Sequence, residues 1–134
     1  MKPGKIIRLK NIDENRGNLT VAQGGMDFPF PIARAYWIKD VPAGDTRGGH
    51  AHKKLVEYVV AVNGSFNVTL DNGREKAAYH LCHPWEALLI DKCVWCSLDS
   101  FSSDAVCLAL ASEPFDADDY IHDYSEFIEL IERI

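Results

Sequence analysis

The sequence contains no apolar run long enough to cross a bilayer, and no basic leader followed by an apolar core. A membrane-spanning helix needs about 20 consecutive apolar residues, and a secretory signal peptide needs an apolar stretch behind its basic start. Positive charge is also in deficit, because 14 Lys and Arg residues stand against 20 Asp and Glu residues. Surfaces that bind nucleic acid are normally basic. These absences predict a cytoplasmic protein whose partners include neither a membrane nor nucleic acid.

Cysteine is sparse, with four residues and no two pairs spaced as in a zinc site. Cys93 and Cys96 form one C-x-x-C inside an apolar run. On a strand this odd spacing directs the two thiols to opposite faces. Since nothing indicates secretion, the cysteines are predicted to be reduced thiols buried in the core.

Neither an internal repeat nor a low-complexity linker divides the 134 residues, so one domain is predicted over residues 1–134. Apolar and polar residues alternate in many short segments, as over residues 66–70, and this period is typical of strands with one buried face. Asn63-Gly64 and Asn72-Gly73 favour hairpin turns. An all-β sandwich or barrel is therefore predicted, with strands over residues 5–11, 32–41, 55–62, 65–70, 76–81, 87–91, 94–98 and 105–111.

The last segment, residues 116–134, has a different pattern. Its apolar residues recur mostly at intervals of three and four, and its acidic residues gather at the start, where the helix dipole favours them. One or two short helices are predicted here, packed on the outside of the barrel.

His50 and His52 are the most informative residues of the chain. Two residues at i and i+2 on an extended segment point to the same face, roughly 6.5 to 7 Å apart. Imidazole exchanges protons near neutral pH and is also a common metal ligand. The pair therefore indicates either proton transfer or metal chemistry. The other histidines lack such a partner and are interpreted as surface or structural residues: His80, His83 and His122, the last expected in the terminal helix.

The spacing Gly44-(x5)-His50-x-His52-(x4)-Glu57-(x6)-Gly64 resembles the first cupin motif. In that motif two strands of a small jelly-roll barrel bring two histidines and a glutamate into the interior. The second cupin motif is only partly met, because Leu89 lies near the place of a third histidine. The resemblance implies an all-β, single-domain cupin jelly-roll barrel with a short C-terminal helical segment.

A closer resemblance covers almost the whole chain, and it is to the WxcM-like sugar 3,4-ketoisomerases of the cupin superfamily. It rests on RGNLT at 16–20, PFPIARAY at 29–36, RGGHAHK at 47–53, LAS at 110–112 and DDYI-x-DY-x-x-F at 118–127. It implies a homodimer that converts dTDP-4-keto-6-deoxyglucose to a 3-keto isomer without a metal or another cofactor. Such a reaction belongs to the synthesis of sugars for bacterial surface polysaccharides. Cupins commonly dimerise by exchanging an edge strand, and residues 5–11 are a candidate.

For this reaction we predict that one of His50 and His52 exchanges the carbon proton and the other an oxygen proton, and the sequence does not distinguish the two roles. Arg34 and Tyr36 share one face of their predicted strand, and we expect this face to line the barrel interior. From there they could donate hydrogen bonds to the enediolate oxygen of the reaction. Alternatively, Arg34 or Arg47 could hold the diphosphate, because a planar guanidinium pairs well with phosphate oxygens. The predicted substrate-binding residues are Arg34, Tyr36, Arg47, Lys53 and Trp95. The alternatives are core packing for the two aromatic residues, a structural ion pair for Arg34 and a solvated surface charge for Lys53.

Two other functions stay open. Glu57 occupies a place where these isomerases usually carry glutamine, and with His50 and His52 it completes a set of two histidines and one carboxylate, known from open iron sites. A metal-dependent cupin enzyme is therefore one alternative. The other is a cupin module that binds a nucleotide sugar without turning it over.

Overall fold

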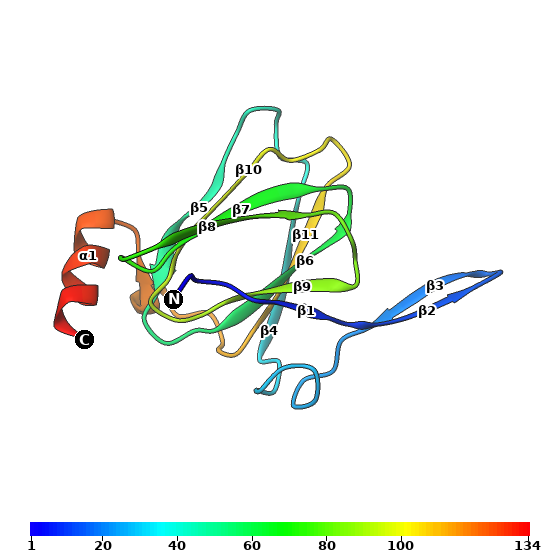
Figure 1. Ribbon diagram of the computed structural model, residues 1–134, viewed down its shortest axis with the longest axis horizontal. Helices are drawn as coiled ribbons and strands as arrows, with labels where there is room; N and C mark the ends of the chain where they lie inside the picture. Colours follow the sequence, from blue (N-terminus) through cyan, green and yellow to red (C-terminus); the bar gives the residue numbers. More distant parts are fainter.

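The computed structural model describes residues 1–134, in which two five-stranded antiparallel sheets face one another (Figure 1). The first has the order β1-β9-β6-β11-β4 and the second β12-β5-β10-β7-β8, while β2 and β3 form a separate hairpin. This arrangement confirms the predicted all-β barrel with a C-terminal helix. The strands are β1 (Ile6–Arg8), β2 (Lys10–Glu14), β3 (Gly17–Val21), β4 (Arg34–Lys39), β5 (Arg47–His52), β6 (Glu57–Asn63), β7 (Phe66–Asp71), β8 (Lys76–Leu81), β9 (Glu86–Ile90), β10 (Trp95–Asp99), β11 (Val106–Ala111) and β12 (Tyr120–Ile121).

The core lies between the two sheets and follows from the alternation of apolar residues along their strands. Phe66, Val68 and Leu70 on β7 are fully buried, while Asn67 and Thr69 between them are less so. Removing each such apolar side chain from water contributes roughly 1.5 to 3 kcal/mol. Alternate residues of β6, β9, β10 and β11 complete the same cluster. The core is therefore built from both sheets.

Asn63-Gly64 does not form the predicted hairpin. It joins β6 in the first sheet to β7 in the second, whereas Asn72-Gly73 joins the paired strands β7 and β8 as predicted. Gly64 has a φ of +63°, and the Ser65 N–H that follows donates to the Ser102 hydroxyl. The Asn-Gly sequence would suit a hairpin turn. Here it forms a corner between the two sheets instead, because the strand before it, β6, belongs to the first sheet and the strand after it, β7, belongs to the second.

The predicted strand over residues 5–11 is divided in two at Leu9. The side chain of Leu9 is buried and its N–H donates to the Trp85 carbonyl, next to β9, before the chain continues into β2. The following strand β2 pairs with β3, which was not predicted, and this hairpin extends from the body of the barrel (Figure 1). The extended segment predicted to carry His50 and His52 is the strand β5.

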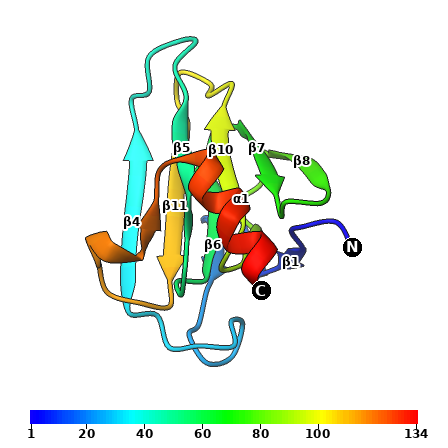
Figure 2. The same ribbon diagram turned by 90° about the vertical axis from the view of Figure 1, so that its left-hand side faces the viewer.

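The C-terminal segment contains less helix than predicted. A 3-10 turn over Ala117–Asp119 leads into β12, and only then does the helix α1 (Tyr124–Arg133) begin. Asp123 caps α1 by accepting the N–H of Ser125. Phe127 is fully buried against Ala51 of β5 and Ile121 of β12. The helix thus covers one end of the barrel beside the strand that carries the histidines (Figure 2). No helix of the structure is both long and apolar enough to span a bilayer.

Candidate active site

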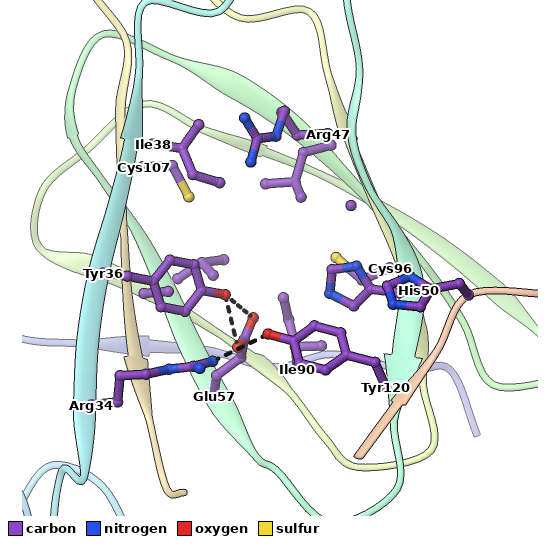
Figure 3. A pocket seen from close by; sticks show the side chains of 15 residues that line it. Arg34, Tyr36, Ile38, Arg47, His50, Glu57, Ile90, Cys96, Cys107 and Tyr120 are labelled. Atoms are coloured by element: carbon purple, nitrogen blue, oxygen red, sulfur yellow. Dashed lines mark hydrogen bonds between the residues drawn. The ribbon is translucent and has the colours of Figure 1, made fainter. Parts of the chain in front are cut away.

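A cavity of about 330 Å³ opens between the two sheets (Figure 3). Strand alternation places every second residue of its walls toward the space. Arg34, Tyr36 and Ile38 point inward from β4 and His50 does so from β5, where the backbone of Gly48 also lines the cavity. The rest of the lining is mostly apolar and consists of Arg47, Glu57, Val59, Ile90, Cys96, Leu98, Cys107, Ala109, Tyr120 and His122.

The two histidines of β5 lie close together, as their spacing indicated. Their ring centroids are 5.0 Å apart and the ring planes are nearly perpendicular. His50 lines the cavity, whereas His52 is 4% exposed and lies behind it, with the Tyr120 ring 4.3 Å away. The pair therefore presents one imidazole to the cavity and keeps the other almost fully buried.

Both imidazoles are held neutral near pH 7. Burial lowers the pKa of His50, and the neighbouring His122 lowers it further. Burial likewise lowers the pKa of His52 to about 4, with a further contribution from His50 and an opposing one from Asp119. A neutral imidazole can accept a proton, so His50 is available as a base at the cavity wall.

Tyr36, which is half-buried, and Glu57, which is buried, form a polar pair on the wall facing His50 (Figure 3). The Tyr36 hydroxyl donates to both carboxyl oxygens of Glu57, each at 3.1 Å. Burial raises the pKa of Glu57 to about 7, although the Tyr36 hydrogen bond and the charge of Arg34 oppose this change. Burial, followed by the charge of Glu57, raises the pKa of Tyr36 above its usual range. Tyr36 is therefore a hydrogen-bond donor throughout the neutral range.

Arg34 supplies positive charge beside this pair. Its guanidinium lies over the Tyr36 ring, 5.0 Å from the centroid, and its Nη2 donates to the Tyr120 hydroxyl at 3.4 Å. The Nε of Arg34 is buried and has no hydrogen-bond partner in the protein. Arg47 enters the lining nearer the other end of the cavity (Figure 3). Two guanidiniums in one cavity suit an anionic ligand.

His50, His52 and Glu57 do not form a metal site. No group of three or more His, Cys, Asp or Glu side chains in the protein is arranged to hold a metal ion. The carboxyl of Glu57 comes from the sheet opposite β5 and is engaged by Tyr36. The metal-dependent alternative therefore gains no support from the arrangement of its three residues.

Two predicted substrate contacts, Lys53 and Trp95, lie outside the cavity. Lys53 follows His52 and points to a surface hollow beside Glu126 and Glu129. Trp95 lies on the outer face of β10, because Cys96 next to it points inward, and its ring packs against Tyr124 and Phe127 of α1. Trp95 thus takes the packing role that was its alternative interpretation.

Tyr120 and His122 line the cavity although neither was among the predicted site residues. His122 is not in the helix, contrary to the prediction, and its ring stacks on Tyr120 at 5.4 Å. Tyr120 belongs to β12 and pairs with His52 of β5, and His122 directly follows this strand. Their i and i+2 spacing was the available signal, but it was obscured by the helical pattern of the same segment.

The cysteines only partly follow the prediction. All four are free, and Cys96 and Cys107 are buried at the cavity wall. Cys82 is exposed and Cys93 is half-buried in a turn. Burial raises the pKa of Cys107 to about 12 and that of Cys96 further, so these two thiols act as apolar lining.

Comparisons with known proteins agree on one group of enzymes. The model of the FdtA family, described as WxcM-like, C-terminal, matches residues 2–132. A TDP-4-oxo-6-deoxy-α-D-glucose 3,4-oxoisomerase of Aneurinibacillus thermoaerophilus is 39% identical over 130 residues, which cover 97% of this chain and 94% of that protein.

Solved structures show the same likeness. A mutant of the QdtA 3,4-ketoisomerase of Thermoanaerobacterium thermosaccharolyticum, in complex with TDP-4-keto-6-deoxyglucose, superposes with a TM-score of 0.95 at 35% identity, covering 98% of this chain and 95% of its own. The WlaRB TDP-quinovose 3,4-ketoisomerase of Campylobacter jejuni gives a TM-score of 0.90 at 36% identity, covering 94% of this chain and 97% of its own.

Proposed function

Because the chain belongs to the FdtA family of WxcM-like C-terminal domains, we propose that it is a 3,4-ketoisomerase acting on a TDP-4-keto-6-deoxyhexose. It is an enzyme of the isomerase class, as is its oxoisomerase relative. The observation that carries the proposal is the cavity itself, in which the neutral imidazole of His50 faces the hydroxyl of Tyr36 and the guanidinium of Arg34.

The reaction moves the ketone from C4 to C3 of the sugar. A base removes the proton from C3, the electron pair forms a C3–C4 double bond, and O4 takes up negative charge or a proton. The hydroxyl on O3 then loses its proton as C4 receives one, so atoms and electrons balance without a redox partner. The whole sequence needs only groups that exchange protons and groups that stabilise an enediolate.

We assign the carbon proton to His50, because it is the neutral imidazole that lines the cavity. A positioned acid–base group of this kind typically contributes about 10² to 10⁴ in rate. His52 is assigned the second acid–base role, exchange of an oxygen proton. Its Nδ1 faces the Asp119 carboxylate at 3.5 Å, so Nε2, which has no hydrogen-bond partner in the protein, is the nitrogen left for this exchange.

The two arginines of the cavity are assigned to two different parts of the substrate. Arg34 lies beside Tyr36 at one end of the cavity, where it stabilises the negative oxygen of the enediolate. Arg47 lies toward the other end, where its guanidinium can pair with the diphosphate. Lys53 and Trp95, whose side chains lie outside the cavity, have no part in this assignment.

Deuterium exchange tests the activity directly. Metal-free protein is incubated with TDP-4-keto-6-deoxyglucose and a chelator in deuterated water, and the sugar carbons are followed by NMR. We expect a 3-keto product carrying deuterium at C4. Turnover that stops with chelator and returns with added metal would instead indicate a metal-dependent enzyme, and binding without exchange would indicate a non-catalytic module.

Replacing single histidines refines that test. His50→Asn should abolish exchange at C3, whereas His52→Asn should leave slow exchange at C3 and retard net conversion. His80→Asn is a matched control, because His80 is exposed on β8 and hydrogen-bonds only Asn67. Loss of C3 exchange in His52→Asn together with its retention in His50→Asn would reverse the assignment.

We also propose that the enzyme is a cytoplasmic homodimer that supplies sugars for surface polysaccharide. Its four free cysteines suit a reducing compartment. β1 pairs with β9 at one edge of its sheet, so a partner's β1 can replace it there by strand exchange. A solution mass of twice 15.0 kDa by light scattering supports the dimer, and a mass of one chain contradicts it.

A further inference from the structure

Glu57 is a buried carboxyl in the cavity wall to which the mechanism above gives no role. We propose that Glu57 is a positioning residue that sets the direction of the Tyr36 hydrogen bond. When its carboxyl is neutral, the Tyr36 hydroxyl is free to donate to the substrate oxygen on which enediolate charge develops. This inference rests on the proposed isomerase activity and adds to it a residue that decides when that donor is available.

The geometry allows two arrangements of one proton. Tyr36 Oη lies 3.1 Å from each carboxyl oxygen of Glu57, and no other hydrogen bond reaches that carboxyl. An ionised carboxylate can only accept, so the single hydroxyl proton of Tyr36 must then point at Glu57. A protonated carboxyl can donate to Tyr36 Oη instead. The hydroxyl proton of Tyr36 is then released toward the cavity that both side chains line.

The surroundings of Glu57 make this change of state accessible near neutral pH. Burial outweighs the opposing effects of Arg34 and the Tyr36 hydrogen bond and raises the pKa of Glu57 to about 7. Arg34 is the charged group that acts on Glu57, and the second guanidinium of the cavity, that of Arg47, lies toward the other end (Figure 3). Four other groups come from β4, β5, β10 and β11 and are uncharged in this range, because burial is the largest cause of each pKa shift and favours the neutral form: Tyr36, His50, Cys96 and Cys107. Tyr120 of β12 and His122 complete the polar lining.

The consequence for catalysis is a window of pH. The reaction needs a neutral imidazole at His50, which becomes protonated in acid. It also needs a neutral carboxyl at Glu57, which ionises in base. Once Glu57 ionises, Tyr36 turns away from the substrate and the enediolate loses a donor. Removal of one such donor typically costs about 10² to 10³ in kcat, so kcat should fall about tenfold per pH unit above pH 7 until that loss is complete.

The experiment compares kcat against pH for the wild type, Glu57→Gln and Tyr36→Phe, with TDP-4-keto-6-deoxyglucose as substrate. The glutamine amide donates to Tyr36 Oη at every pH, so Glu57→Gln should keep the acid limb and lose the alkaline limb near pH 7. Tyr36→Phe should be about 10²-fold slower at pH 6 and should also lack that limb. Glu86→Gln on β9 is the matched control, because Glu86 lies outside the cavity and should retain the wild-type profile.

Infrared spectroscopy of the substrate-free protein supplies a readout independent of turnover. The carbonyl band of a buried, protonated carboxyl should disappear in the wild type as pH rises through 7, and it should be absent from Glu57→Gln. An alkaline limb that persists in Glu57→Gln, or a band that does not titrate near pH 7, would overturn the inference while leaving the isomerase assignment intact. A wild type that shows no turnover at any pH contradicts the proposed function, and the role given to Glu57 with it.

Discussion

The Asp119 carboxylate lies 3.5 Å from Nδ1 of His52, and both side chains are about 5% exposed. The same carboxylate accepts the N–H groups of Lys54 at 2.8 Å and Leu55 at 3.1 Å. Asp119 therefore fixes the turn that follows β5 and at the same time places a negative charge beside the second histidine. The 3-10 turn near the C-terminus thus determines the environment of a residue far away in the sequence.

Asp119→Asn should lower both the stability of the fold and the pKa of His52. The carboxylate raises the pKa of His52 against the larger effect of burial, so its removal should move that pKa below about 4. One of the two backbone N–H groups loses its acceptor, which costs about 1 to 3 kcal/mol. Urea unfolding and NMR titration of the His52 ring measure the two effects. Asp118→Asn, at an exposed position of the same turn, is the control, and equal effects in both variants would contradict the role of Asp119.

The two histidines should lower the stability of the fold as the pH falls from 6.5 to about 4. In the folded protein the pKa of His52 is lowered to about 4 from an ordinary 6.5, and that of His50 is also lowered. At these two residues the unfolded chain binds more protons in this window, so their contribution to stability falls with the pH, while Glu57 contributes in the opposite sense between pH 7 and 4.5. Urea midpoints of the wild type and His52→Asn, measured from pH 7.5 to 3.5, isolate the part due to His52. The midpoint of the wild type should fall relative to that of the variant as the pH is lowered, and a constant difference would contradict the neutral state of the folded ring.

Base should destabilise the fold through Glu57, in the opposite sense to an ordinary carboxyl. Its pKa is raised from 4.5 to about 7 in the folded protein, so the folded state binds the extra proton between these values and stability falls as pH rises through them. At about 1.4 kcal/mol per unit of pKa, the full effect is on the order of 3 kcal/mol. Glu57→Gln should therefore be more stable than the wild type at pH 8 and close to it at pH 4, as measured by thermal unfolding.

The parts of the site that the sequence predicts are those that depend on one strand alone. His50 with His52, and Arg34 with Tyr36, each share a face because alternation along a strand is local. His50 and Tyr36 belong to opposite sheets. They line the same cavity because the two sheets face one another in the barrel, and their spacing in the sequence does not predict this.

The parts that could not be predicted depend on pairing between distant segments. Tyr120 enters the site because β12 pairs with β5, and no local pattern specifies that partner. The apolar spacing that predicts α1 also runs through β12, so His122 was placed in a helix instead of beside His50. The position of Trp95 could not be predicted for a related reason. The sequence pattern of a strand predicts that its side chains alternate between two faces, but it does not predict which face lines the cavity.

Replacing Gly64 by alanine should carry two costs, one from its positive φ and one from steric contacts of the added methyl group. Gly44 allows the two costs to be measured apart. At Gly64 φ is +63°, and an added Cβ would lie 2.6 Å from Asp104 Oδ1 and 2.8 Å from the Ala105 Cα, besides meeting the Ser102 hydroxyl. At Gly44 φ is +83°, but an added Cβ would meet nothing within 4 Å. Positive φ alone costs a non-glycine residue roughly 1 to 2 kcal/mol.

Gly44→Ala should therefore lose about that amount in urea unfolding, whereas Gly64→Ala should lose distinctly more, because the corner between β6 and β7 must open to admit the methyl group. The difference between the two variants isolates the steric cost from the backbone cost. Since the corner holds β6, which carries Glu57, against the second sheet, Gly64→Ala should also reduce kcat, while Gly44→Ala should not. Equal losses of stability in the two variants would contradict a steric cost at Gly64.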